Sequence, residues 1–180
     1  MIITLCGFMG CGKSTLGRGL AQTCGCRFID LDEYIEAKWG MSVSAIFEKR
    51  GEEWFRNEEC ASLEEIVDEY NYLNSKEGYT LVLALGGGTV TSERSAKVVK
   101  EHTTCVYLDC PKEVLLERLV KNNSRRPLLA GKSREQISDS IDALMLRREA
   151  IYRSTASRIY STEGKRLKDV IVDFATIFAL

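Results

Sequence analysis

Residues 7–14 constrain the fold of this chain more than any other segment, because they match the pattern Gly-x-x-x-x-Gly-Lys-Ser/Thr. They read Gly7-Phe8-Met9-Gly10-Cys11-Gly12-Lys13-Ser14. In this pattern the glycines let the backbone curl until several N–H groups point at anionic oxygens. The lysine puts a positive charge on the β- and γ-phosphates of a nucleotide, and the hydroxyl can bind Mg²⁺. The segment therefore predicts a phosphate-binding loop, or P-loop.

The flanking residues supply the setting that this loop requires. Residues 2–6 form a short apolar run, as expected of a buried parallel strand. Leu16, Leu20 and Ala21 follow the loop at helical spacing. A helix that starts there would direct the positive end of its dipole at the phosphates.

The rest of the chain alternates between strand-like and helical patterns. Apolar strand-like runs occur at residues 2–6, 27–30, 80–85, 104–109 and 157–161. Helical patterns occur at residues 14–23, 32–39, 52–73, 92–101, 111–121, 134–153 and 167–178. This alternation predicts an α/β fold with a parallel sheet and helices on both faces. We interpret residues 71–79 as a polar connection and residues 122–133 as a mobile flap over the phosphate site.

Composition limits the classes of protein and partner that need to be considered. A chain of 180 residues is normally one domain. Its formal net charge of −1 provides no overall attraction for nucleic acid. No apolar stretch is long enough to span a membrane, and a strand beginning at residue 2 leaves no room for a signal peptide.

The cysteines favour a reducing compartment. There are 7, an odd number, and no Cys-x-x-Cys pair is present. This argues against a disulfide framework or a zinc site, so we expect a cytoplasmic protein. Cys11 lies inside the phosphate loop, where N–H groups and Lys13 could activate its thiol toward alkylation.

Two carboxylates close the second predicted strand, in the sequence Asp30-Leu31-Asp32. Side chains at i and i+2 of a strand point the same way, so both should face the ligand crevice beside the phosphate loop. One could hold the water shell of Mg²⁺, and the other could orient or deprotonate a substrate hydroxyl. The alternative is that Asp32 caps the following helix.

Three glycines, Gly86 to Gly88, follow the third predicted strand, where we expect a ligand or another group to approach the backbone closely. Arg56, Arg126 and Arg148 have forked guanidinium groups that match carboxylates and phosphates. Taken singly, each arginine is more often a solvated surface charge.

Together these features resemble the shikimate kinase family. The resemblance rests on six segments in chain order: GFMGCGKST at 7–15, FIDLD at 28–32, IFEKRGEEWFR at 46–56, GGG at 86–88, RPLL at 126–129 and Arg-x-x-x-Tyr at 148–152. It implies a P-loop NTPase-type three-layer fold with a five-stranded parallel sheet. It implies one kinase domain over residues 1–180, with a lid over about 122–134 and a shikimate-binding helical region over about 32–61.

The resemblance also implies an activity. This is the ATP-dependent phosphorylation of the 3-hydroxyl of shikimate to shikimate 3-phosphate, with ADP as the second product, on the way to chorismate and the aromatic amino acids. It implies ATP and Mg²⁺ as the nucleotide and the metal ion, and shikimate as the small-molecule partner. We further expect a monomer that binds neither nucleic acid nor membrane.

Site residues follow from the resemblance position by position. The implied catalytic residues are Lys13, Asp32 and Arg126. The implied nucleotide-binding residues are Gly10, Cys11, Gly12, Lys13, Ser14, Thr15, Arg126 and Lys165. The implied shikimate-binding residues are Asp32, Arg56, Gly86, Gly87, Gly88 and Arg148, and the implied metal-binding residues are Ser14 and Asp30. The adenine contacts are the least defined, with Arg118 a further candidate.

Two other interpretations stay open at this point. Another small-molecule P-loop kinase, such as a gluconate or nucleotide kinase, would share most of these motifs. A nucleotide sensor without catalytic activity would bind nucleotide but show no turnover that depends on an acceptor. The absence of an Asn-Lys-x-Asp sequence argues against a GTPase.

Overall fold

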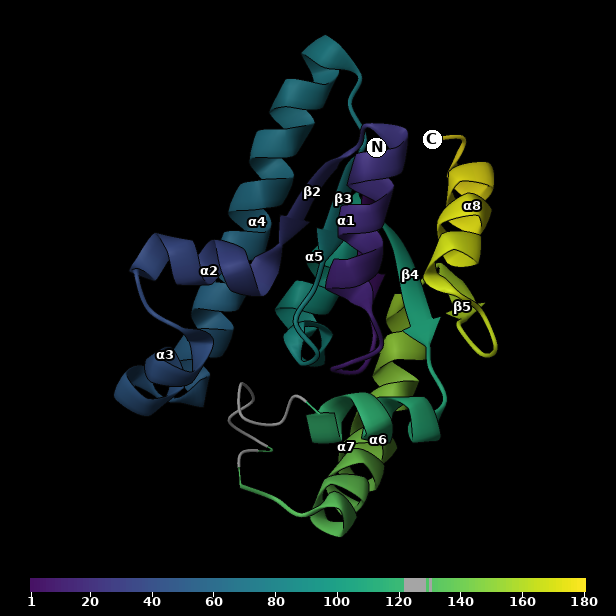
Figure 1. Cartoon of the computed structure of the whole chain (residues 1–180). Coiled ribbons are helices and arrows are strands. Elements are labelled where there is room, and N and C mark those ends of the chain that lie inside the picture. The colour runs from purple at the N-terminus through teal and green to yellow at the C-terminus, as the bar shows by residue number, and fades with distance from the viewer. Residues whose placement is uncertain (122–128, 130) are drawn as a thin grey trace.

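A computed structural model describes residues 1–121, 129 and 131–180 of the chain (Figure 1). The strands are β1 (Ile2–Cys6), β2 (Arg27–Asp30), β3 (Leu81–Ala84), β4 (Thr104–Asp109) and β5 (Arg158–Ser161). The helices are α1 (Lys13–Cys24), α2 (Leu31–Trp39), α3 (Val43–Arg50), α4 (Glu52–Glu77), α5 (Glu93–His102), α6 (Lys112–Lys121), α7 (Arg134–Thr155) and α8 (Leu167–Phe178). A short 3-10 helix, η1, covers Thr89–Thr91.

The strands form one parallel five-stranded sheet in the order β2-β3-β1-β4-β5. All residues of β1 and β3 are buried, as the apolar sequences of strands covered on both faces require. Strands β3 and β2 lie on one side of β1, and β4 and β5 lie on the other, so the order of the strands reverses direction at β1. Ligands bind at the carboxyl end of such a switch point, which here is the loop after β1.

Helices cover both faces of the sheet. Figure 1 shows α1 and α8 side by side on one face, and they contact each other. On the other face α5 packs against α4, α7 and β4. Helices α2 and α3 pack on α4 beyond the β2 edge (Figure 1). The prediction of a parallel sheet with helices on both faces is confirmed.

Two sequence-based predictions of elements are wrong. Helix α3 falls where no helix was expected, because its eight residues include only one buried apolar side chain, that of Ile46. Its ends nevertheless carry ordinary signals, since the Ser42 hydroxyl accepts from the Ala45 N–H and Gly51 follows its last residue. Residues 71–77 are not part of a connection, because α4 continues to Glu77 and only residues 78–80 link it to β3. Extending an existing helix adds a hydrogen bond per residue, which outweighs weak local propensity.

The predicted lid, residues 122–134, falls largely outside the described residues. The residues of this range that the structure does describe are anchored. The Leu129 side chain is buried, and Ser133 and Gln136 form a reciprocal capping box at the start of α7. In the part of the chain that is described, no helix is long and apolar enough to cross a membrane.

Candidate active site

The phosphate loop connects β1 to α1 and is held in shape by its own lysine. The Lys13 ammonium donates hydrogen bonds to the carbonyl oxygens of Gly7, at 2.9 Å, and Phe8, at 3.1 Å. Gly12 precedes α1 with a φ of 106°, a backbone conformation that a side chain would strain. The Lys13 side chain is almost wholly buried and lines the pocket beyond the loop. The loop is therefore held in shape by contacts within the protein.

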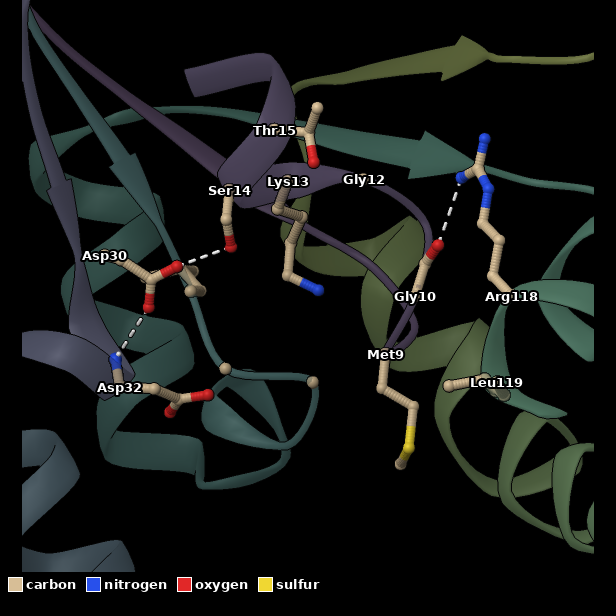
Figure 2. Close-up of a pocket in the computed structure, with 13 residues that line it drawn as sticks. Met9, Gly10, Gly12, Lys13, Ser14, Thr15, Asp30, Asp32, Arg118 and Leu119 are labelled. Carbon is tan, nitrogen blue, oxygen red and sulfur yellow. Dashed lines mark hydrogen bonds between the residues drawn. The ribbon is translucent and has the colours of Figure 1, made fainter. Parts of the chain in front are cut away.

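This pocket, of roughly 230 Å³, lies at the carboxyl end of the sheet (Figure 2). It is formed by the phosphate loop and start of α1, the end of β2, the loop after β3, and α6. The lining residues are Met9, Gly10, Gly12, Lys13, Ser14, Thr15, Asp30, Asp32, Leu85, Gly86, Gly87, Arg118 and Leu119. Most of the sequence-predicted site residues thus meet around one cavity.

Ser14 and Asp30 lie together on one wall of the pocket. The Ser14 hydroxyl donates to Asp30 Oδ2 at 2.5 Å (Figure 2). The other oxygen of Asp30 accepts from the N–H groups of Asp32 and Glu33, so Asp30 is the N-cap of α2. The capping alternative considered for Asp32 is therefore wrong, because Asp30 fills that role. A hydroxyl and a carboxylate beside a phosphate loop are oxygen donors of the kind that Mg²⁺ takes.

Asp32 enters the pocket from the first turn of α2, not from a strand as predicted. The strand ends at Asp30, so an alternation of side chains along a strand does not explain how the two carboxylates come together. Burial raises the pKa of Asp32 to about 6, and the nearby carboxylates of Glu59 and Asp30 add to this rise. The positive charges of Lys13 and Arg56 act in the opposite direction. Asp32 can therefore take up or release a proton near neutral pH.

The glycine loop, Gly86 to Gly88, is crowded by the side chains around it. A Cβ on Gly86 would lie 2.6 Å from Glu59 Oε1 and 3.0 Å from Asp32 Oδ1. A Cβ on Gly88 would lie 2.6 Å from Arg56 Nη2. The absence of side chains therefore brings a carboxylate and a guanidinium against the backbone of this loop, as the three glycines predicted.

Arg56 is held beside the glycine loop by a carboxylate that the sequence analysis missed. Glu59 accepts from Arg56 Nη1 at 2.7 Å and from the buried Thr89 hydroxyl at 2.5 Å. The Glu59 side chain is only 1% exposed, so the pair is fixed within the protein. The spacing i, i+3 on a helix was the signal available in the sequence, since it puts both side chains on one face.

Arg148 reaches the same loop from α7. Its Nη1 donates to the Gly87 carbonyl oxygen at 3.2 Å, and the Tyr152 hydroxyl donates to that oxygen at 2.5 Å. Arg56 and Arg148 therefore lie at adjacent glycines, although 92 residues separate them in the chain. The structure brings the two predicted carboxylate-binding arginines together with Asp32 around the glycine loop.

Helix α6 forms the opposite wall of the pocket. Arg118 Nη1 donates to the Gly10 carbonyl oxygen at 3.1 Å, and Leu119 lines the cavity below it (Figure 2). Arg118 thus lies at the phosphate loop, where a bound nucleotide would pass.

Five of the described residues that were predicted for the site do not line the pocket. Arg56, Gly88 and Arg148 belong to the glycine loop or contact it, and the other two are Lys165 and Cys11. Lys165 follows β5 and pairs with Asp173 and the Tyr160 hydroxyl, away from the residues that line the pocket. Cys11 belongs to the loop, but its side chain is buried, with Lys13 Nζ 3.8 Å from its sulfur. Burial of this kind argues against ready alkylation. Arg126 lies in the segment that the structure does not describe.

In the described part of the chain, protein side chains alone do not form a metal site. No group of three or more His, Cys, Asp or Glu side chains there is arranged to hold an ion. Ser14 and Asp30 offer two oxygens, and a Mg²⁺ ion bound with a nucleotide usually takes its other ligands from phosphates and water.

Comparison with known proteins agrees with this arrangement. A model of the shikimate kinase family matches residues 9–177. The shikimate kinase of Persephonella marina is 40% identical over 91% of this chain and 90% of its own length. That of Chlorobium limicola is 38% identical over 94% of this chain and 82% of its own.

Solved structures give the same result at the level of the fold. A shikimate kinase from Acinetobacter baumannii, in complex with shikimate, has a TM-score of 0.85 and 33% identity, covering 99% of this chain and 92% of that one. Shikimate kinase from Bacteroides thetaiotaomicron has a TM-score of 0.87 and 29% identity, covering 100% of this chain and 99% of that one. With the family match over nearly the whole sequence, these similarities show that the chain belongs to the shikimate kinase family.

Proposed function

We propose that this protein transfers the γ-phosphoryl group of ATP to the 3-hydroxyl of shikimate, giving shikimate 3-phosphate and ADP. The observation that carries the proposal is the meeting of Asp32, Arg56 and Arg148 at the glycine loop. Gly86 and Gly87 of this loop line the same pocket as the phosphate loop. Such a site fits an acceptor that has both a carboxylate and a hydroxyl. Membership of the family supports the choice of shikimate.

Charge is distributed in the site as two anionic substrates require. Lys13, the N-terminus of α1 and Arg118 lie on the side of the phosphate loop. Arg56 and Arg148 lie on the side of the glycine loop. The formal net charge of the whole chain is only −1, so local grouping of cations, not overall charge, attracts the substrates.

The proposed chemical step is an in-line displacement. The 3-hydroxyl oxygen of shikimate forms a bond to the γ-phosphorus as the bond from that phosphorus to the β,γ-bridging oxygen breaks, and ADP leaves. Asp32 accepts a hydrogen bond from the attacking hydroxyl and takes its proton. A carboxyl group with a pKa of about 6 is mostly ionised at neutral pH and is a stronger base than an ordinary aspartate.

Positioning accounts for the rest of the catalysis. Lys13 neutralises charge on the β- and γ-phosphates, and the loop N–H groups hold their oxygens. Mg²⁺ would be held by Ser14 and Asp30 and would supply further neutralisation of the phosphates. Arg56 and Arg148 bind the shikimate carboxylate, which orients the 3-hydroxyl toward the phosphate loop.

Three further assignments complete the proposal. Arg126, in the predicted lid over about 122–134, contacts the ATP phosphates when the lid closes and excludes water. Residues 1–180 act as one monomeric domain, with the shikimate-binding region over about 32–61. The protein works in the cytoplasm, in the pathway to aromatic amino acids.

A coupled assay of ADP release tests the proposal. Purified protein with ATP and Mg²⁺ is offered shikimate, gluconate and other carboxylated polyols at equal concentrations. Shikimate should stimulate ATP consumption far more than the others. A preference for gluconate would favour a different small-molecule kinase, and ATP binding without stimulation by any acceptor would favour a nucleotide sensor.

A further inference from the structure

The hydrogen bonding of the Gly87 carbonyl oxygen points to a role for Tyr152. Two donors from one face of α7 bind this oxygen: Tyr152 Oη at 2.5 Å and Arg148 Nη1 at 3.2 Å. A carbonyl oxygen has two lone pairs, so both are used. Since Arg148 and Tyr152 are four residues apart on a helix, their side chains lie one above the other and reach the same point.

The two donors differ in how firmly they are held. Tyr152 is fully buried, and its ring stacks on that of Tyr107 in β4, with centroids 5.4 Å apart. Burial raises the pKa of its hydroxyl well above the ordinary value, so it remains a donor at every working pH. Arg148 is only partly buried, and its bond to Gly87 is the longer one.

In the proposed function Arg148 binds the carboxylate of the acceptor, and its guanidinium turns from the Gly87 oxygen to do so. A carbonyl oxygen left inside the protein without any partner is costly, and that cost would oppose the movement of Arg148. The Tyr152 hydroxyl removes this obstacle, because it stays on the oxygen after Arg148 leaves.

We propose that Tyr152 is a positioning residue for the acceptor: its hydroxyl keeps the Gly87 carbonyl oxygen bonded and so frees Arg148 to bind the substrate carboxylate. The inference rests on the proposed function and adds a residue to it. Tyr152 acts through Arg148 and need not touch shikimate or ATP.

Tyr152→Phe tests this inference, because it removes only the hydroxyl and keeps the stacked ring. Of the two donors, only Arg148 then remains on the Gly87 oxygen, so its movement to the substrate becomes costly. The KM for shikimate should therefore rise about tenfold, while the KM for ATP stays within about twofold. Tyr107→Phe is the matched control, since it removes a hydroxyl from the partner ring in the same stack and should leave both KM values unchanged.

A double-mutant cycle separates positioning from a general loss of structure. In an Arg148→Ala background, Tyr152→Phe should have little further effect on kcat/KM for shikimate, since there is no guanidinium left to free. Equal effects of Tyr152→Phe in both backgrounds would overturn the inference. So would an unchanged shikimate KM in the single variant, provided that the unaltered protein phosphorylates shikimate. If even the unaltered protein fails to do so, the proposed function itself is wrong.

A second measurement needs no variant. In a crystal structure of the unaltered protein with shikimate bound, Tyr152 Oη should remain within hydrogen-bonding distance of the Gly87 oxygen, and Arg148 should have left it for the carboxylate. Arg148 still bonded to Gly87 in that complex would overturn the inference.

Discussion

At the scale of single residues, the ionised form of Asp32 that the proposed catalysis uses also destabilises the folded protein. Its carboxyl group has a pKa of about 6 in the folded protein, against an ordinary value of 3.8. A raised pKa means that the folded protein favours the protonated form. The stability that this preference provides is present in full below about pH 4 and is lost as the pH rises through about 6.

We therefore expect Asp32→Asn to affect activity and stability in opposite directions. Turnover should fall at least about a hundredfold, because the group that accepts the hydroxyl proton is gone. At pH 7.5 the variant should be more stable by about 3 kcal/mol, since about 1.4 kcal/mol accompanies each pKa unit between 3.8 and about 6, and at pH 4 the gain should vanish. Thermal unfolding at both pH values, with ATP binding as a check on the fold, measures this. A variant less stable than the unaltered protein at pH 7.5 would show that the Asp32 charge is not strained.

The same group predicts a pH profile for the unaltered enzyme. Log kcat/KM for shikimate should fall below about pH 6 with a slope of one, because this ratio reports ionisation in the enzyme without substrate. Steady-state rates between pH 4.5 and 8.5 test it. A profile that is flat down to pH 5 would remove Asp32 from the proton transfer.

Lys13 is the residue on which the phosphate loop depends most. Lys13→Ala removes the charge from the phosphates and also the bonds to the Gly7 and Phe8 carbonyl oxygens. Turnover should fall at least about a hundredfold, as loss of a preorganised electrostatic group typically gives. Near-normal turnover in a folded variant would exclude Lys13 from the mechanism.

At the scale of elements, the glycine loop is a part of the site where an added side chain would displace Arg56. In Gly88→Ala the new Cβ would lie 2.6 Å from Arg56 Nη2, the end of a flexible side chain that can move. We expect little loss of stability but a rise of about tenfold in the shikimate KM, because Arg56 is pushed from its place. The KM for ATP, measured in the same assays, should stay unchanged. If both KM values rose together, the loop would be serving the nucleotide as well.

Elements also show where sequence reasoning succeeded and where it failed. All five strands were predicted within one residue. For β1, β3 and β4 the reason is that buried parallel strands read as continuous apolar runs. Helix α3 and the last turns of α4 were missed, since helix formation there depends on caps and on propagation from an existing helix, not on an apolar stripe.

At the scale of the whole molecule, the candidate site joins residues far apart in the sequence. Motif spacing alone could name Asp30, Asp32, Arg56 and Arg148, but not the contacts between them. Glu59 and Tyr152 were not foreseen as parts of the site, because the groups that tie them to the glycine loop, the Thr89 hydroxyl and the Gly87 carbonyl oxygen, come near them only in the folded chain. Lys165, implied by the family resemblance as a nucleotide contact, pairs with Asp173 and is not among the residues that line the pocket.

This convergence predicts a selective effect of Arg148→Ala. The shikimate KM should rise far more than the ATP KM, because truncating one side of a charge pair costs about 2–5 kcal/mol. Arg147→Ala is the matched control. The Arg147 side chain, next to Arg148 on α7, is exposed to solvent, so its removal should leave both KM values unchanged. Equal effects of Arg148→Ala on the two substrates would remove Arg148 from the acceptor site.

The most direct test of the account is to identify the product. Purified protein is incubated with ATP, Mg²⁺ and shikimate, and the reaction is followed by phosphorus NMR with coupling to the carbon-bound protons of the acceptor. The product should be a phosphomonoester on the 3-hydroxyl of shikimate, formed in equal amount to ADP. Inorganic phosphate alone, a phosphate on another hydroxyl, or unchanged ATP would contradict it.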